Sequence, residues 1–279
     1  MRLPVNGAEL EVEVLGPEGA PVLIAHHGGP GLGSRSEPKA SFGALSDTYR
    51  VVVFDARGNG ESSDTPPYSH EQWAADVEAL REWTGAEKII MAGGSYGGFV
   101  SLEYALRYPD RVQALVLRDT AAADRFRGHA RQRALETDRT TIDMDLFDRC
   151  FAGQARDNDD FKASWRAILP LYDYDYDPTK VDERADNTIY HYATHNYAFS
   201  TNLPKYDVTA KLHLITCPVL ITVGRHDWIT PVEASEELAA NIPGSELVIF
   251  EKSGHSPQTE ERDAWLASVR RFLAGVVST

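Results

Sequence analysis

The sequence has no apolar run long enough to cross a membrane. A membrane-spanning helix needs about 20 consecutive apolar residues, and no stretch of the 279 residues approaches that length. Residues 1–7 also lack the apolar core of a signal peptide. We therefore expect no association with a membrane and a cytoplasmic location.

Cysteine is scarce as well. Only Cys150 and Cys217 occur, and neither has a second cysteine at the spacing of a zinc site or a redox motif. His26 and His27 are adjacent, but neighbouring residues of a strand point to opposite faces, so they cannot easily share one ion. We take both cysteines to be ordinary buried or half-buried thiols and predict no metal site and no cofactor.

Positive charge is also in short supply. The chain has 28 Lys and Arg residues against 42 Asp and Glu residues, a formal net charge of −14. Proteins that bind nucleic acids neutralise phosphates with clustered Lys and Arg, so this balance argues against a nucleic-acid partner. An excess of negative charge favours solubility instead. The expected partner is a small-molecule substrate, and the sequence specifies no oligomeric state.

Apolar residues make up 42% of the chain, and they lie in short runs separated by helical segments. The alternation over 9–14 is typical of a half-exposed strand, which we interpret as an edge strand. A continuous apolar run, typical of a strand covered on both faces, occurs at 21–26, and further strands are predicted at 50–55, 112–119, 218–223 and 246–250. Helices are predicted at about 69–84, 232–240 and 258–274. The pattern indicates an α/β fold, with a mostly parallel sheet and helices on both faces.

This alternation of strand and helix stops at about Thr120 and resumes near Tyr206. The residues between them contain helix-like, charged segments at 127–140 and 157–169, separated by an aromatic and acidic run at 171–178. We predict that 120–205 is a helical cap inserted into a core made of 1–119 and 206–279. Such a cap would lie above the carboxyl ends of the strands, where open α/β sheets bind their ligands.

One serine lies between an apolar strand and a helix. Residues 89–92 are apolar, Gly93-x-Ser95-x-Gly97 follows, and an amphipathic segment begins at Phe99. In this context the Gly-x-Ser-x-Gly pattern is a nucleophile elbow, a strand-to-helix turn so tight that it needs glycine on both sides of the serine. The turn places the hydroxyl at a helix N-terminus, which favours a developing anion. Ser95 is therefore the candidate nucleophile.

Two later strand ends offer the groups that a serine nucleophile needs. A serine hydroxyl requires a general base, and a carboxylate must hold that base in the correct tautomer. Asp227 follows the strand at 218–223, and His255 follows the strand at 246–250. The chain order Ser, Asp, His is the order that α/β-hydrolases use. Taken singly, Asp227 could cap the next helix and His255 could be a solvated loop residue, but together they predict a triad with Ser95.

With these residues the chain resembles the α/β-hydrolase superfamily, and more narrowly the proline iminopeptidase-like serine hydrolases, over all but the predicted cap. The resemblance implies the α/β-hydrolase fold, cofactor-free hydrolysis of a small amide or ester through an acyl-enzyme, and an oxyanion hole formed by backbone N–H groups of Gly29 and Tyr96. The motifs are His27-Gly28-Gly29-Pro30-Gly31, Asp55-x-Arg57-Gly58-x-Gly60-x-Ser62, Gly93-Gly94-Ser95-Tyr96-Gly97-Gly98, Gly224-Arg225-His226-Asp227-x-x-Thr230-Pro231 and Gly254-His255.

The chain departs from these relatives where they bind a free α-amino group. Many of them carry an acidic residue in a Glu-Asn-His-Tyr-like cap motif or directly after the triad Asp, and here Thr194 and Trp228 occupy those places. We therefore expect only a modest dependence on a free amine. Acids of the predicted cap, such as Glu183 and Asp186, are the remaining groups that could pair it.

The candidate substrate contacts are Trp228, Tyr197 and His27, since aromatic side chains under a lid often line ligand sites. Two other functions stay open. One is a carboxylesterase or lactonase with a neutral acyl pocket, and the other is a non-catalytic ligand receptor on the same fold, because the fold alone does not fix function.

Overall fold

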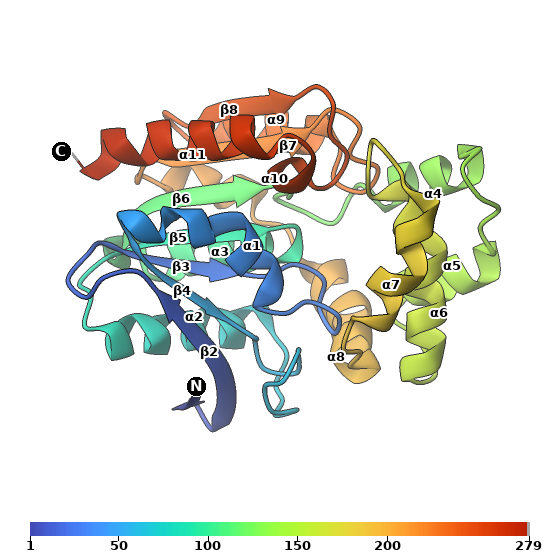
Figure 1. The fold of residues 1–279 in the computed structure, drawn as a ribbon, viewed down its shortest axis with the longest axis horizontal. Coiled ribbons are helices and arrows are strands. Elements are labelled where there is room, and N and C mark those ends of the chain that lie inside the picture. Colours follow the sequence, from blue (N-terminus) through green and yellow to red (C-terminus); the bar gives the residue numbers. More distant parts are fainter. Residues whose placement is uncertain (278–279) are drawn as a thin grey trace.

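The computed structural model, which describes residues 1–277, contains an eight-stranded sheet in the order β1-β2-β4-β3-β5-β6-β7-β8 (Figure 1). Strands β3 to β8 run parallel, and β1 and β2 are antiparallel to their neighbours. This confirms the predicted fold class. The strands are β1 Arg2–Val5, β2 Ala8–Leu15, β3 Val22–His26, β4 Arg50–Phe54, β5 Ile89–Gly94, β6 Val112–Arg118, β7 Val219–Gly224 and β8 Glu246–Phe250.

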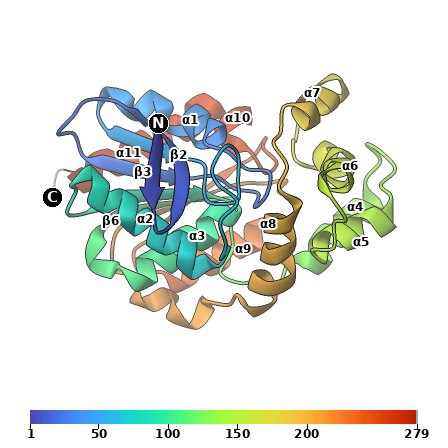
Figure 2. The ribbon, with the colours of Figure 1, turned by 90° about the horizontal axis from the view of Figure 1, so that it is seen from below.

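Helices cover both faces of the sheet, as Figure 2 shows. Alternate strand residues point to opposite faces, so Ile24 and Met91 join a core cluster with α2, α3 and α9, whereas Leu23 and Ile90 join a second cluster with α1 and α11. The continuous apolar run at 21–26 is therefore explained by burial of β3 on both sides. These helices are α1 Ser36–Phe42, α2 His70–Thr84, α3 Tyr96–Arg107, α9 Val232–Asn241, α10 Pro257–Glu260 and α11 Arg262–Val277.

Two details of the sequence interpretation were wrong. The strand at 9–14 is not an edge strand, because β1 pairs with its outer side and forms the edge. Asn6 and Gly7 both have positive φ angles, 48° and 79°, as a tight hairpin turn between β1 and β2 requires. The helix predicted over 258–274 is divided into α10 and α11, with Glu261 between them. By contrast, α2 begins at the predicted Ser69 cap, which accepts from the N–H of Gln72, and ends at Gly85.

The segment 120–205 contributes five helices that lie beyond the carboxyl ends of the parallel strands (Figure 1). They are α4 Arg127–Glu136, α5 Met144–Phe151, α6 Asn158–Ile168, α7 Val181–Asp186 and α8 Tyr192–Tyr197, the last continuing into a π-helical turn at Ala198–Asn202. Phe147, Phe151, Phe161 and Ile168 form a separate apolar cluster there, which also takes in Trp228 from the loop after β7. That this segment acts as a cap over the site stays a prediction.

Among residues 1–277, none of the helices is both long and apolar enough to cross a membrane.

Candidate active site

Ser95 lies between β5 and α3, in the strained turn that its flanking glycines predict. Its φ angle is 53°, in a region that non-glycine residues rarely occupy, and such strain is characteristic of functional sites. Hydrogen bonds hold the backbone of Ser95 in this conformation, since its N–H donates to Arg118 O at 2.8 Å and its carbonyl accepts from Thr120 Oγ1 at 2.8 Å. At Gly97 a Cβ atom would lie 2.6 Å from two backbone carbonyl oxygens. Only glycine therefore allows this turn.

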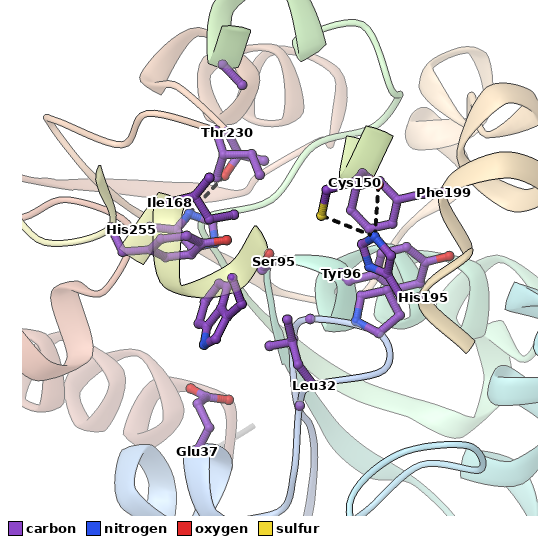
Figure 3. A pocket seen from close by; sticks show the side chains of 18 of the residues that line it. Leu32, Glu37, Ser95, Tyr96, Cys150, Ile168, His195, Phe199, Thr230 and His255 are labelled. Atoms are coloured by element: carbon purple, nitrogen blue, oxygen red, sulfur yellow. Dashed lines mark hydrogen bonds between the residues drawn. The ribbon is translucent and has the colours of Figure 1, made fainter. Parts of the chain in front are cut away.

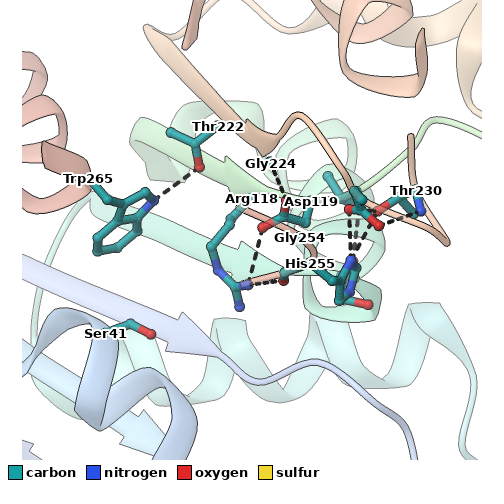
Figure 4. Close-up of polar contacts among 12 residues, drawn as sticks. Ser41, Arg118, Asp119, Thr222, Gly224, Thr230, Gly254, His255 and Trp265 are labelled. Carbon is teal, nitrogen blue, oxygen red and sulfur yellow. Dashed lines mark hydrogen bonds and ion pairs between the residues drawn. The ribbon is translucent and has the colours of Figure 1, made fainter. Parts of the chain in front are cut away.

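Asp227 and His255 meet behind the cavity that contains Ser95. Asp227 Oδ2 lies 2.7 Å from His255 Nδ1, and both side chains are buried. The carboxylate also accepts from Thr230 Oγ1 at 2.8 Å and from the N–H groups of Ile229 and Thr230 at 2.9 and 3.0 Å. Figure 4 shows this cluster. With Nδ1 held by the carboxylate, Nε2 of the neutral ring is left as the acceptor.

The pKa values of this pair move apart. Burial alone would raise the pKa of Asp227, but the charge and hydrogen bond of His255 and the two backbone N–H donors lower it below the usual range. For His255, burial alone would lower the pKa, but the charge and hydrogen bond of Asp227, with a smaller contribution from Asp119, raise it above 6.5. The carboxylate is therefore ionised at neutral pH, and it stabilises a protonated His255 when one forms.

A cavity of about 370 Å³ contains Ser95 and His255 in its lining (Figure 3). The predicted oxyanion residues Gly29 and Tyr96 line it too. Tyr96 is the first residue of α3, where N–H groups have no partner within the helix. The Gly-rich loop packs directly on the serine, since a Cβ atom at Gly28 would lie 3.1 Å from Ser95 Cβ. The arrangement thus gathers the candidate nucleophile, the candidate base and two candidate oxyanion residues around one space.

The three candidate substrate contacts do not belong to the lining found among the described residues. Trp228 is 2% exposed and packs on the rings of Tyr172, Phe147 and Phe151. Tyr197 packs edge-on against Tyr68. The apolar lining comes instead from residues that no motif marks, chiefly Phe99, Phe151, Phe161, Trp165, Ile168 and Phe199.

Both ring nitrogens of His27 form hydrogen bonds with the backbone around it. Its Nε2 accepts from the N–H of Ala56 at 3.1 Å, and its Nδ1 donates to Gly28 O at 2.7 Å. The expectation that His26 and His27 point to opposite faces was wrong, because β3 ends at His26 and their ring centroids lie 4.9 Å apart. Burial lowers the pKa of both rings, that of His26 to about 3. Both histidines therefore act here as neutral structural groups.

Sequence reasoning missed a second buried carboxylate next to the pair. Asp119 directly follows β6, is 0% exposed and has a φ angle of 46°. One ligand atom each from Asp119, Asp227 and His255 lie within 4.8 Å of one another, a spacing that a metal ion could use. However, Asp119 already accepts from the N–H of Gly224 at 3.0 Å and is paired with Arg118 at 3.3 Å. The strand-end rule that marked Asp227 also applies to Asp119 and could have found it.

Burial and the charge of Asp227 raise the pKa of Asp119 to about 7. Arg118 links this acid to both sides of the site. Its guanidinium also donates to His255 O at 3.3 Å (Figure 4), and it pairs with Glu37 at 2.7 Å. No pattern in the sequence marks Arg118 or Glu37 as site residues. Their role follows only from the packing of β6 beside the loop after β8.

Two acidic side chains line the cavity, and each is already paired with an arginine. Glu37 pairs with Arg118, and Asp124 Oδ2 lies 2.6 Å from Arg127 Nε. Arg127 is fixed in place because it also donates to Phe151 O at 2.6 Å and to Phe199 O at 3.0 Å. The described lining therefore offers no free carboxylate to a positively charged group.

Comparison with known proteins agrees with this geometry. The family model for the alpha/beta hydrolase fold matches residues 21–262. Proline iminopeptidase PfmaB of Pestalotiopsis fici is 36% identical over 276 residues, covering 96% of this chain and 97% of the relative. A proline iminopeptidase of Saccharolobus solfataricus is 28% identical, with 92% and 86% covered. Among solved structures, a thermophilic esterase from Thermogutta terrifontis superposes with a TM-score of 0.77 at 27% identity, covering 99% of this chain and 98% of the esterase.

The chain belongs to the α/β-hydrolase family. Within that family it is a proline iminopeptidase-like hydrolase, as the resemblance predicted.

Proposed function

We propose that the protein hydrolyses a small amide or ester through an acyl-enzyme, with Ser95 as nucleophile, His255 as general base and Asp227 as the group that orients His255. In the first step Ser95 Oγ attacks the substrate carbonyl carbon while His255 Nε2 takes the hydroxyl proton. The tetrahedral intermediate then expels the amine or alcohol, which receives that proton. Water, activated by the same histidine, releases the acid and restores Ser95.

The observation that carries this proposal is the buried 2.7 Å contact between Asp227 and His255, at the wall of the cavity that Ser95 also lines. We assign the oxyanion hole to the N–H groups of Tyr96 and Gly29, which line the same space. A preorganised donor of this kind contributes about 3–4 kcal/mol to the transition state. The other two acidic residues near the site, Asp119 and Glu37, are not needed for any of these steps.

We propose that the segment 120–205 is a cap that encloses the substrate. In support, its residues Phe151, Phe161 and Phe199 line the cavity that Ser95 also lines, and its helices lie beyond the carboxyl ends of the parallel strands (Figure 1). A cavity of about 370 Å³ suits a small acyl group. A cytoplasmic location stays a prediction.

Two substrate classes compete. The named relatives are proline iminopeptidases, which favours an amide with a free prolyl nitrogen. Glu37 and Asp124 are each paired with an arginine, so neither is free to bind a charged amine. This favours the alternative, an ester or lactone with an uncharged acyl group. Of the cap acids that could supply a free charge, Asp186 is exposed and paired with Lys162, and neither it nor Glu183 is in the described lining.

A fluorophosphonate probe tests the mechanism. We expect one adduct on the native protein, none on Ser95→Ala, and an unchanged adduct on Ser200→Ala, which removes an exposed serine of the cap segment. Asp227→Asn should keep the fold and lower turnover by about 10⁴-fold, because the imidazole loses its tautomer control. A native protein that binds ligands but takes no adduct would favour the receptor function instead.

A further inference from the structure

The loop that carries His255 is held by a segment from the other side of the cavity. We call residues 172–175 the strap and residues 252–256 the base loop. The N–H of His255 donates to Tyr172 O at 2.7 Å, and the Tyr172 ring lies edge-on to the His255 ring with centroids 5.3 Å apart. The contact is so close that a Cβ atom at Gly254 would lie 2.3 Å from Tyr172 O. The strap therefore forms part of the support of the candidate base.

One carboxylate joins the strap to the base loop. Glu260 Oε1 accepts from the N–H groups of Tyr174 and Asp175 at 2.6 and 3.1 Å, and Glu260 Oε2 accepts from the N–H of Gly254 at 2.6 Å. Each oxygen thus serves a different segment. Hydrogen bonds to an ionised acceptor are stronger than neutral ones, so this bridge is a firm connection between 254 and 174–175.

The strap is also tied to the helices beyond the cavity and to the loop of the candidate acid. Arg139, between α4 and α5, donates to Pro170 O at 2.9 Å and to Tyr174 O at 2.9 Å, and it also contacts Asp173 O. The Tyr174 ring stacks on His226, the residue before Asp227, with centroids 4.5 Å apart. The strap, which is itself part of 120–205, therefore contacts Arg139 of the same segment, His226 beside Asp227, and the base loop.

We propose that Glu260 is a positioning residue, which sets the place of His255 relative to Ser95 by bridging the strap and the base loop. The inference rests on the proposed function of His255 as general base. Glu260 touches no substrate atom in this account and acts only through the backbone of 254 and 174–175. An ordinary loop anchor would support stability, whereas a positioning residue changes the chemical step, and these two roles predict different kinetics.

Glu260→Gln tests the bridge with little change of shape. One carboxylate oxygen becomes an NH₂ group that faces an N–H donor, so one side of the bridge is lost. We expect kcat for a p-nitrophenyl ester to fall about 10- to 100-fold, the effect of a small misplacement of a catalytic group, with KM changed less than about threefold. The rate of fluorophosphonate labelling should fall in parallel. Asp263→Asn, an exposed acid at the start of α11, is the matched control and should change neither.

A second variant separates positioning from general loss of stability. Arg139→Gln releases the strap from its other side, and because both residues act through one strap, the double variant should lose less than the product of the two single losses. Native labelling rates in Glu260→Gln would overturn the inference, and so would independent effects of the two variants or a rise in KM alone. If Glu260→Gln fails to fold, Arg139→Gln must show the kcat loss by itself. A native protein that takes no adduct would refute the proposed function rather than the bridge.

Discussion

The arginine pairing of Asp124 predicts how the protein treats a free amine on its substrate. The perturbation is N-acetylation, which converts the ammonium of a prolyl arylamide into a neutral amide. At an effective dielectric constant of about 20, an ammonium about 4 Å from a carboxylate gains about 4 kcal/mol. Asp124, however, lies 2.6 Å from Arg127, and an ammonium about 5 Å from that guanidinium loses about 3 kcal/mol by the same relation. The net gain is about 1 kcal/mol.

This difference sets the expected ratio of rates. A net gain of about 1 kcal/mol corresponds to about a fivefold preference for the free amine, whereas an unpaired carboxylate would give roughly a thousandfold preference. The arginine cannot swing aside to free Asp124, because Phe151 O and Phe199 O hold its other nitrogens. We therefore expect N-acetylation to lower kcat/KM by less than about tenfold.

The assay compares kcat/KM for L-prolyl-arylamide, its N-acetyl form and p-nitrophenyl esters of short acids. Asp124→Asn removes the gain of about 4 kcal/mol and leaves the loss of about 3 kcal/mol caused by Arg127, so it should turn the fivefold preference for the free amine into a preference of roughly a hundredfold for the acetylated substrate. Asp186→Asn, which changes an exposed acid paired with Lys162, is the control and should leave the ratio unchanged. A loss of about a thousandfold on acetylation would refute the reasoning and show that an acidic group pairs the amine after all. If that preference disappears in Asp124→Asn, Asp124 is that group.

Two further predictions concern pH and the cap. His255 must be neutral to accept the serine proton, and its pKa is raised, so activity should be lost as the pH falls, with a midpoint above 6.5 in a kcat/KM profile. Asp119→Asn removes a nearby negative charge and should lower that midpoint. A rate that stays flat down to about pH 4 would show that His255 is not the base. Replacement of 120–205 by a short linker should leave a folded core that no longer discriminates between substrates, measured by circular dichroism and a panel of esters. Loss of all folding would show that the segment belongs to the core.

The core of the fold could be predicted because its signals are local. Residues 89–92 and 112–117 are apolar in every position that the sheet buries, and Ser69 and Gly85 mark the ends of α2 by their own chemistry. The hairpin of β1 and β2 was missed although Asn6-Gly7 is a strong turn signal, because four residues of β1 are too few to show a period.

The positions of Ser95, Asp227 and His255 could be predicted for a topological reason. In a parallel sheet every strand ends at the same edge, so residues in the loops that follow β5, β7 and β8 converge there whatever their separation in the sequence. The same reason should have marked Asp119 after β6. Its burial at 0% exposure and its pKa of about 7 depend on the neighbouring loops, which no strand pattern describes.

The lining of the cavity lay beyond sequence reasoning, because it is made by contacts between segments with no common period. Trp228 was a reasonable substrate contact by its place next to Asp227, yet Phe147 and Phe151 of α5 pack against it, and Phe151 itself lines the cavity. Which aromatic side chain faces the substrate is decided by how α5 and α6 pack on the loop after β7, and helix packing depends on side-chain shape at both surfaces. Specificity in this fold is therefore free to change through residues such as Phe151 and Trp165, while the strand ends keep the chemistry fixed.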